Sequence, residues 1–230
     1  MMKKIIITCA IMSLATIANS SNINDLNISG SAKIANQQYK SINISGQFEA
    51  DKVTASDSTK ISGNASFKNS QFHSLIVSGN AFLYNSKVDG EINISGKLTL
   101  ENSDLKGNNL NCSGTIKSIN STYELPINIS GELVSFKDKF NDIISFSGKI
   151  EADNSTFNKT ITTSSIKSIW KNSVIHADII NESKSLFMTP TIVLENTIVM
   201  GKIKFTKNKG LVILKNKSIV NGSIENADIK

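Results

Sequence analysis

Few side chains in this sequence are suited to catalysis, and they lie far apart. His73 and His176 have neither a second histidine nor a cysteine nearby, which argues against a metal site or a catalytic triad. Cys112 is the only cysteine beyond the first twenty residues, and it stands at an apolar position of the repeat described below, so we expect a buried thiol. The sequence therefore predicts no catalytic, cofactor-binding or metal-binding residue, and a protein that is not an enzyme.

A group of carboxylates is the main alternative. Glu132, Asp138 and Asp142 could approach Glu151 and Asp153 on the next coil of a repeating structure. Stacked carboxylates can bind Ca²⁺ or act as acid and base on a sugar. Lysines are interleaved with these acids, however, which favours simple pairing of surface charges. All 25 basic residues are lysine, so the chain has no guanidinium to clamp an acidic sugar.

An internal repeat indicates the elements that position these residues. An apolar residue followed by Ser-Gly recurs eight times, in steps of 16 to 18 residues. The first residues of these triplets are Ile28, Ile44, Ile61, Val77, Ile94, Cys112, Ile129 and Phe146. Constant spacing over so many copies is typical of solenoids.

Apolar residues follow each triplet in register. Numbering the first triplet residue as one, they occupy positions five, seven and twelve, and a further position just before the next triplet, as in Leu98, Leu100, Leu105 and Leu110. Spacing by two indicates strands. The chain is therefore predicted to be all-β, a single-stranded parallel β-helix (β-solenoid) of about eleven coils with 16–18 residues per coil. A β-sandwich is the less favoured alternative, because it would need hairpin turns and irregular spacing.

Two residue types are predicted to form the corners. Asparagine occupies position nine in most coils, with Lys52 and Lys137 as exceptions, and asparagine tolerates the left-handed backbone and can stack into an amide ladder. Glycine at position three would turn another corner where a Cβ would clash.

The chain divides into three predicted segments: 1–20, 21–165 and 166–230. Residues 1–20 combine Lys3 and Lys4 with an apolar run and a small-residue cleavage site, which predicts a signal peptide and export to the periplasm, the cell surface or the medium. Residues 21–165 form the regular solenoid, and residues 166–230 continue it with longer coils and a cap. Trp170, at the junction, would plug the widening core or stack against a sugar.

The composition excludes several partners. The formal net charge is +6, and +4 without residues 1–20, which is too small for a nucleic-acid footprint. No second apolar run is long enough to cross a membrane. The Asn and Ser residues flanking the triplets predict a flat polar face, either solvated or able to recognise a repetitive partner. The Asn-x-Ser sequences on it are expected to be by-products of the strand pattern in a bacterial protein.

The repeat resembles a known family. The apolar-Ser-Gly unit near 17 residues, together with 197–203 (TIVMGKI) and 218–224 (SIVNGSI), is similar to the bactofilins, a polymer-forming cytoskeletal group. The resemblance implies a short-coiled β-helix that polymerises end to end. It covers most of residues 28–230 at the level of the repeat and transfers no functional residue.

Two functions follow as expectations. The first is an exported, non-enzymatic β-helical scaffold or surface protein that can associate with itself through its open ends. The second is a polysaccharide-binding or polysaccharide-active β-helix, whose partner would be a cell-surface glycan.

Overall fold

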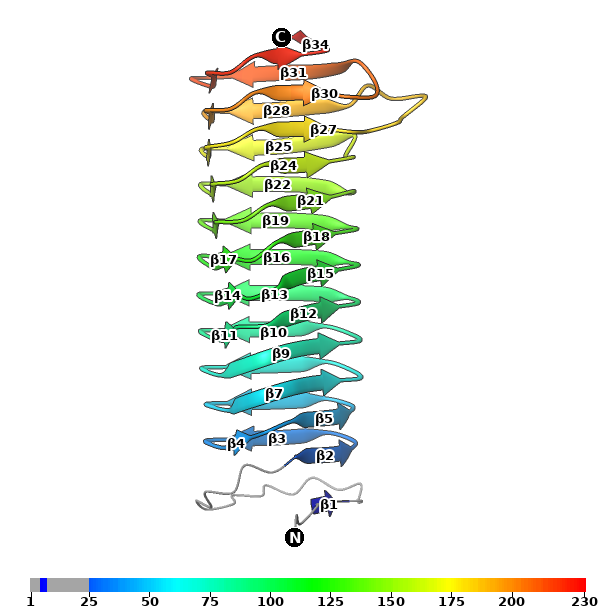
Figure 1. Cartoon of the computed structure of the whole chain (residues 1–230), viewed down its shortest axis with the longest axis vertical. Coiled ribbons are helices and arrows are strands. Elements are labelled where there is room, and N and C mark those ends of the chain that lie inside the picture. The colour runs from blue at the N-terminus through cyan, green and yellow to red at the C-terminus, as the bar shows by residue number, and fades with distance from the viewer. Residues whose placement is uncertain (1–4, 8–24) are drawn as a thin grey trace.

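The computed structural model describes residues 5–7 and 25–230 of the 230-residue chain. Figure 1 shows a straight rod in which parallel strands are stacked coil upon coil, and the described residues contain no helix. The predicted β-solenoid is confirmed. Its wide sheet contributes twelve strands, one per turn, so the rod has about twelve turns and not the eleven expected.

Each turn places its strands in three columns. The wide column consists of β3 (Ala32–Ala35), β6 (Phe48–Asp51), β8 (Ala65–Lys68), β10 (Ala81–Tyr84), β13 (Lys97–Glu101), β16 (Thr115–Ile119), β19 (Glu132–Phe136), β22 (Lys149–Asp153), β25 (Lys167–Lys171), β28 (Thr191–Glu195), β31 (Gly210–Lys215) and β34 (Ala227–Ile229). The column continues across the junction at 165/166, where β22 pairs with β25.

The second column, here the triplet column, carries the apolar-Ser-Gly residues. It consists of β2 (Leu26–Ser29), β5 (Ile42–Ser45), β7 (Thr54–Ile61), β9 (Gln71–Val77), β12 (Glu91–Ile94), β15 (Asn109–Cys112), β18 (Ile127–Ile129), β21 (Ile144–Phe146), β24 (Ile161–Thr163), β27 (Ile179–Asn181), β30 (Ile203–Phe205) and β33 (Ile224–Glu225). Before it stands β1 (Ile5–Ile7), which pairs with β2 in parallel.

The third, short column connects the other two. It consists of β4 (Gln38–Tyr39), β11 (Lys87–Val88), β14 (Asp104–Lys106), β17 (Thr122–Glu124), β20 (Lys139–Phe140), β23 (Thr156–Phe157), β26 (Val174–Ile175), β29 (Ile198–Val199) and β32 (Ile219–Val220). In two of the early turns β7 and β9 span both the short and the triplet columns, and β7 does so through an irregularity between Ala55 and Ser58.

The predicted apolar positions fill the interior. Leu98, Leu100, Leu105 and Leu110, one from each position of a single coil, are fully buried. At position twelve, aromatic rings stack from coil to coil: the centroids of Tyr123 and Phe140 are 4.6 Å apart, as are those of Phe140 and Phe157. Stacking like residues over like thus gives one continuous core along the rod.

Both predicted corners are confirmed. Every position-nine residue, including Lys52 and Lys137, has a left-handed φ between 47° and 58°. The amide ladder is formed in short runs, with Asn85 donating to Asn69 at 2.7 Å and Asn120 donating to Asn102 at 2.6 Å. At the glycine corner, a Cβ on Gly96 would lie 2.5 Å from the carbonyl oxygen of Gly79 one coil below. That contact excludes any side chain there.

The predicted signal peptide, residues 1–20, lies almost wholly outside the described residues. Within it only Ile5–Ile7 are described, as the strand β1.

Candidate functional site

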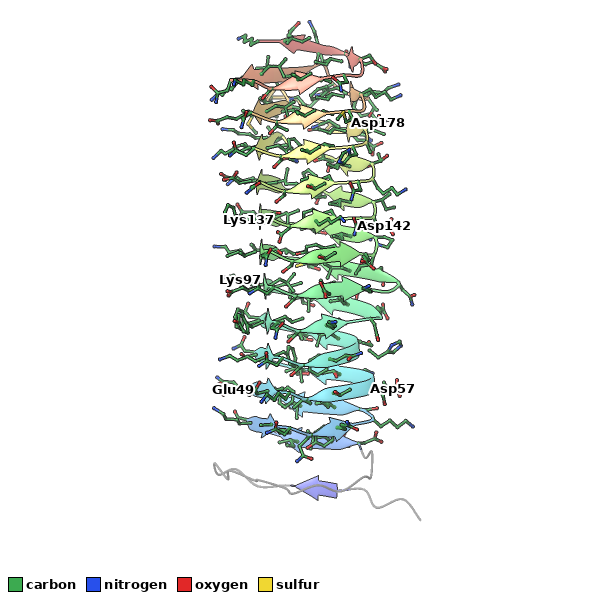
Figure 2. All side chains as sticks on the ribbon, turned by 90° about the vertical axis from the view of Figure 1, so that its left-hand side faces the viewer. Glu49, Asp57, Lys97, Lys137, Asp142 and Asp178 are labelled. Atoms are coloured by element: carbon green, nitrogen blue, oxygen red, sulfur yellow. The ribbon has the colours of Figure 1, made fainter. Side chains whose placement is uncertain are left out.

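The predicted carboxylate group is not assembled. Figure 2 shows Asp142 on the opposite edge of the rod from Lys137, and Asp138 lies inside the rod with 2% of its surface exposed. Glu132 and Glu151 share Lys149, whose Nζ lies 3.2 and 3.4 Å from their carboxylates. The interpretation as surface charge pairing is therefore the correct one.

The remaining members of that group are also engaged. Lys171 approaches Glu151 to 3.1 Å, and this hydrogen-bonded ion pair holds the pKa of Glu151 below its usual value. The Asp153 carboxylate accepts a hydrogen bond from Asn172 at 2.8 Å. Among the described residues, no three His, Cys, Asp or Glu side chains converge on a point where they could hold a metal ion.

The other candidate residues lie in separate places. His73 is exposed and its Nδ1 lies 2.8 Å from the Asp89 carboxylate, whereas His176 is exposed several coils further along. Cys112 is buried, as predicted, and burial raises the pKa of its thiol. Trp170 is completely buried in the core, so the sugar-stacking alternative for it is wrong. Trp170 pairs in register with Ala152 on the preceding coil, and the small side chain of Ala152 leaves room for the indole.

Over part of the polar face predicted on the triplet column, the side chains hydrogen-bond to one another. Asn111 donates to Asn93 at 3.0 Å, and Asn128 donates to Asn111 at 3.1 Å. Each amide is thus occupied by the one on the neighbouring coil, as expected for side chains that stabilise the stack.

Beyond Asn128 the same face is hollowed. A depression of about 190 Å³ lies over β18, β21 and β24, where short side chains replace the asparagines. Its outward lining includes Ser130, Ser145, Ser147, Thr162 and Ser164, with Asn128 at one end and Glu182 at the other. Hydroxyl, amide and carboxylate groups in this arrangement can hydrogen-bond a polyol. Among the described lining residues Glu182 is the only carboxylate, and glycoside cleavage usually needs a pair.

A buried column of hydroxyls was not recognised from the sequence. In most coils, the serine or threonine after the corner residue accepts the backbone N–H of the equivalent residue one coil earlier. Ser70 N–H donates to Ser86 Oγ, and Ser86 N–H to Ser103 Oγ, both at 3.1 Å. The signal was present, because Ser follows the corner asparagine in most coils.

Asp138 occupies this same column. Its carboxylate accepts hydrogen bonds from the Ser121 N–H at 2.8 Å and from the Ser135 hydroxyl at 2.7 Å. Burial raises the pKa of Asp138 to about 6, and these hydrogen bonds oppose the shift. The nearby Tyr123 hydroxyl has no hydrogen-bond partner among the described residues. Asp138 therefore replaces a serine of the column, at an energetic cost, and has no access to a ligand.

No protein-family model, no curated protein and no solved structure matched this chain. Within the described part of the chain, no helix is long and apolar enough to cross a membrane.

Proposed function

We propose that the chain is an exported, non-enzymatic β-helical scaffold that associates with further copies of itself end to end. The observation that carries this proposal is that columns of the rod end in strands with no further partner among the described residues. These strands are β3 and β4 at the amino-terminal end, and β32, β33 and β34 at the carboxyl-terminal end, whereas β2 is paired with β1.

The two ends are complementary in register. Continuing the wide column places Ile229 of one copy over Ala32 of the next, and continuing the short column places Val220 over Tyr39. Ile229 is 56% exposed at the carboxyl-terminal end, whereas Val212 and Ile192 in the same column are fully buried, so another coil would remove Ile229 from water. A head-to-tail contact of this kind does not close, so it produces filaments.

The strand β1 indicates how assembly would be timed. Ile5–Ile7 already pair with β2, with Ile5 opposite Leu26, so this edge accepts a parallel strand. If residues 1–20 are removed as a signal peptide, the edge becomes free after export. Self-association would then be confined to the processed protein.

Electron microscopy and sedimentation of the processed protein test the proposal. Filaments are expected, and Ile229→Lys should abolish them because it places a charge on one end. Added to wild-type protein, Ile229→Lys should shorten filaments by blocking growth at one end. Ile143→Ser, an exposed apolar residue away from both ends, is the matched control and should assemble normally. A wild-type protein that stays monomeric at all concentrations and salt conditions refutes the proposal.

The depression between Asn128 and Glu182 favours glycan binding as a second candidate function. Its lining suits a neutral sugar, and its single described carboxylate favours binding over cleavage. A glycan array with wild-type protein and with Thr162→Phe, which would fill the depression, tests this function. Binding that Thr162→Phe leaves unchanged would place the glycan elsewhere.

A further inference from the structure

One loop carries apolar side chains away from the rod. Residues 182–190, here the side loop, connect β27 to β28 and project from the side of the rod (Figure 1). Leu186, Phe187 and Met188 in this loop are 89%, 95% and 57% exposed. Single exposed apolar residues are common on protein surfaces, but three in succession at a projecting tip indicate an interaction site.

Hydrogen bonds at its base define the shape of the side loop. The Ser185 hydroxyl accepts the Met188 N–H at 3.0 Å, which closes a turn around Leu186 and Phe187. The Asn208 amide donates to the Ser185 carbonyl, and Pro190 is buried. The apolar tip is thus held outward by a turn that is attached to the neighbouring coil.

Lysines lie near the base of the side loop. Lys184 precedes the apolar tip in the side loop, and Lys207 and Lys209 belong to the adjacent loop between β30 and β31. Lys209 pairs with Asp228 at 2.5 Å, whereas Lys184 and Lys207 have no ion-pair partner in the part of the chain that the structure describes. Two cationic side chains therefore remain available at the side loop.

The charge of the whole chain is concentrated in the same region. Residues 166–230 contain ten lysines and five acidic residues, a net charge of +5. Residues 21–165 contain thirteen lysines and fourteen acidic residues, a net charge of −1. The field of the protein would therefore orient this end of the rod towards an anionic surface.

We propose that the side loop binds the surface of an anionic lipid bilayer. Leu186 and Phe187 enter the boundary between headgroups and acyl chains, and Lys184 and Lys207 contact headgroup phosphates. A bilayer requires only an apolar tip with adjacent cations. A stable protein interface buries about 800 Å² on each partner over a surface of complementary shape, whereas the exposed apolar side chains here are three consecutive residues at one tip. The side loop projects from the side of the rod, so binding leaves both ends open for assembly.

Vesicle co-sedimentation tests the proposal. The protein is purified in the form in which the cells that express it release it. Wild-type protein should bind vesicles containing phosphatidylglycerol at least about ten-fold more tightly than vesicles of phosphatidylcholine alone. The double variant Leu186→Ser/Phe187→Ser should lose roughly ten-fold or more in binding to the anionic vesicles. Lys184→Gln/Lys207→Gln should weaken binding to the anionic vesicles by a similar factor and leave binding to the neutral vesicles unchanged. High salt should weaken binding of the wild type to the anionic vesicles in the same way.

Matched controls distinguish binding by the side loop from non-specific binding of the protein to vesicles. Ile143→Ser removes an apolar residue that is 53% exposed on another part of the rod, and Lys97→Gln removes a distant cation. Both should bind as the wild type does. All variants share the same amino-terminal segment, so differences between them report the side loop alone.

Fluorescence locates the contact. Trp170 is the only tryptophan and is fully buried, so it should not respond to brominated lipids. In Phe187→Trp, the fluorescence emission of the added indole should shift to shorter wavelength when anionic vesicles are added. Brominated lipids in these vesicles should quench that emission.

Three results would overturn the proposal. These are equal binding to neutral and anionic vesicles, unchanged binding of the side-loop variants, and an indole at position 187 that brominated lipid does not quench. A fourth result would also refute it: the wild-type protein binds no vesicles, and the side-loop variants lose self-association. The side loop would then bind a second copy of this chain.

Discussion

The regular coils before residue 166 and the coils after it share the same three columns but differ at one corner. In the regular coils, glycine stacks on glycine at the triplet corner, and successive residues at the left-handed corner, asparagine or lysine, are 16 to 18 residues apart. From residue 165 onwards the triplet glycine is replaced: Ser165 and Ser183 stand in its place, and Asn172, Asn196 and Asn216 are 24 and 20 residues apart.

This difference separates two functions of the repeat. The apolar columns specify the stack, and they continue through both regions. The glycine corner brings successive backbones together, and this contact leaves no space from which a longer loop could emerge. Where side chains close the corner instead, as Asn181 does by donating to the Ser165 carbonyl at 3.0 Å, the chain can extend outward, and the side loop emerges there.

Outside the aromatic core, the largest effect should come from exchanging the two kinds of corner. Gly131→Ala should lower the free energy of unfolding by about 3–4 kcal/mol, because its Cβ would overlap the Gly114 carbonyl and the backbones would have to separate. Ser165→Gly, the reverse change at the junction, should cost only about 1 kcal/mol. Urea unfolding followed by circular dichroism measures both. Equal losses would mean that the corners do not differ.

A smaller effect, which depends on pH, should come from Asp138. Its pKa is about 6 in the folded protein and about 3.9 in the unfolded chain, so its stabilising contribution is complete below about pH 4 and is lost as the pH rises through about 6. Asp138→Ser should therefore raise the free energy of unfolding by about 1–3 kcal/mol near pH 8 and change it little near pH 4. A difference between variant and wild type that stays constant with pH would contradict the argument.

The hydroxyl column should be of similar importance in both regions. Ser103→Ala should cost about 1–2 kcal/mol, because the buried Ser86 N–H loses its acceptor. Ser103→Thr should cost less, since Thr197 fills the same position after the junction and accepts from Ser173 at 3.3 Å. Thermal unfolding of the two variants provides the comparison. If Ser103→Ala and Ser103→Thr lower the stability equally, the hydroxyl does not contribute to it.

The smallest effect on stability should come from the side loop. Leu186→Ser/Phe187→Ser should change the free energy of unfolding by less than about 0.5 kcal/mol, because both side chains are exposed. Phe140→Ala, which removes a ring stacked on both sides in the regular coils, should cost about 3–5 kcal/mol. A large loss in the side-loop variant would show that these residues pack against the rod.

The sequence predicted the columns and corners because each coil repeats the same physical requirements. Leu98 and Asn102, for example, are constrained by their neighbours above and below. It did not predict the burial of Asp138, because a lone carboxylate among surface acids was interpreted by its charge and not by its place in the serine column. The longer coils after residue 166 were expected from the spacing, but the apolar tip of the side loop was not: Leu186, Phe187 and Met188 have the composition of a core strand, yet they lie between β27 and β28 and are exposed.

The hydroxyl column gives the rod a direction. In most coils, the backbone N–H after the corner is satisfied by a side-chain oxygen of the following coil, so such a coil is complete only when its successor is in place. In a chain that folds from its amino-terminal end, each added coil would supply the acceptor oxygen that the coil before it lacks. A chain that started at the other end would offer acceptor oxygens before any donor had arrived.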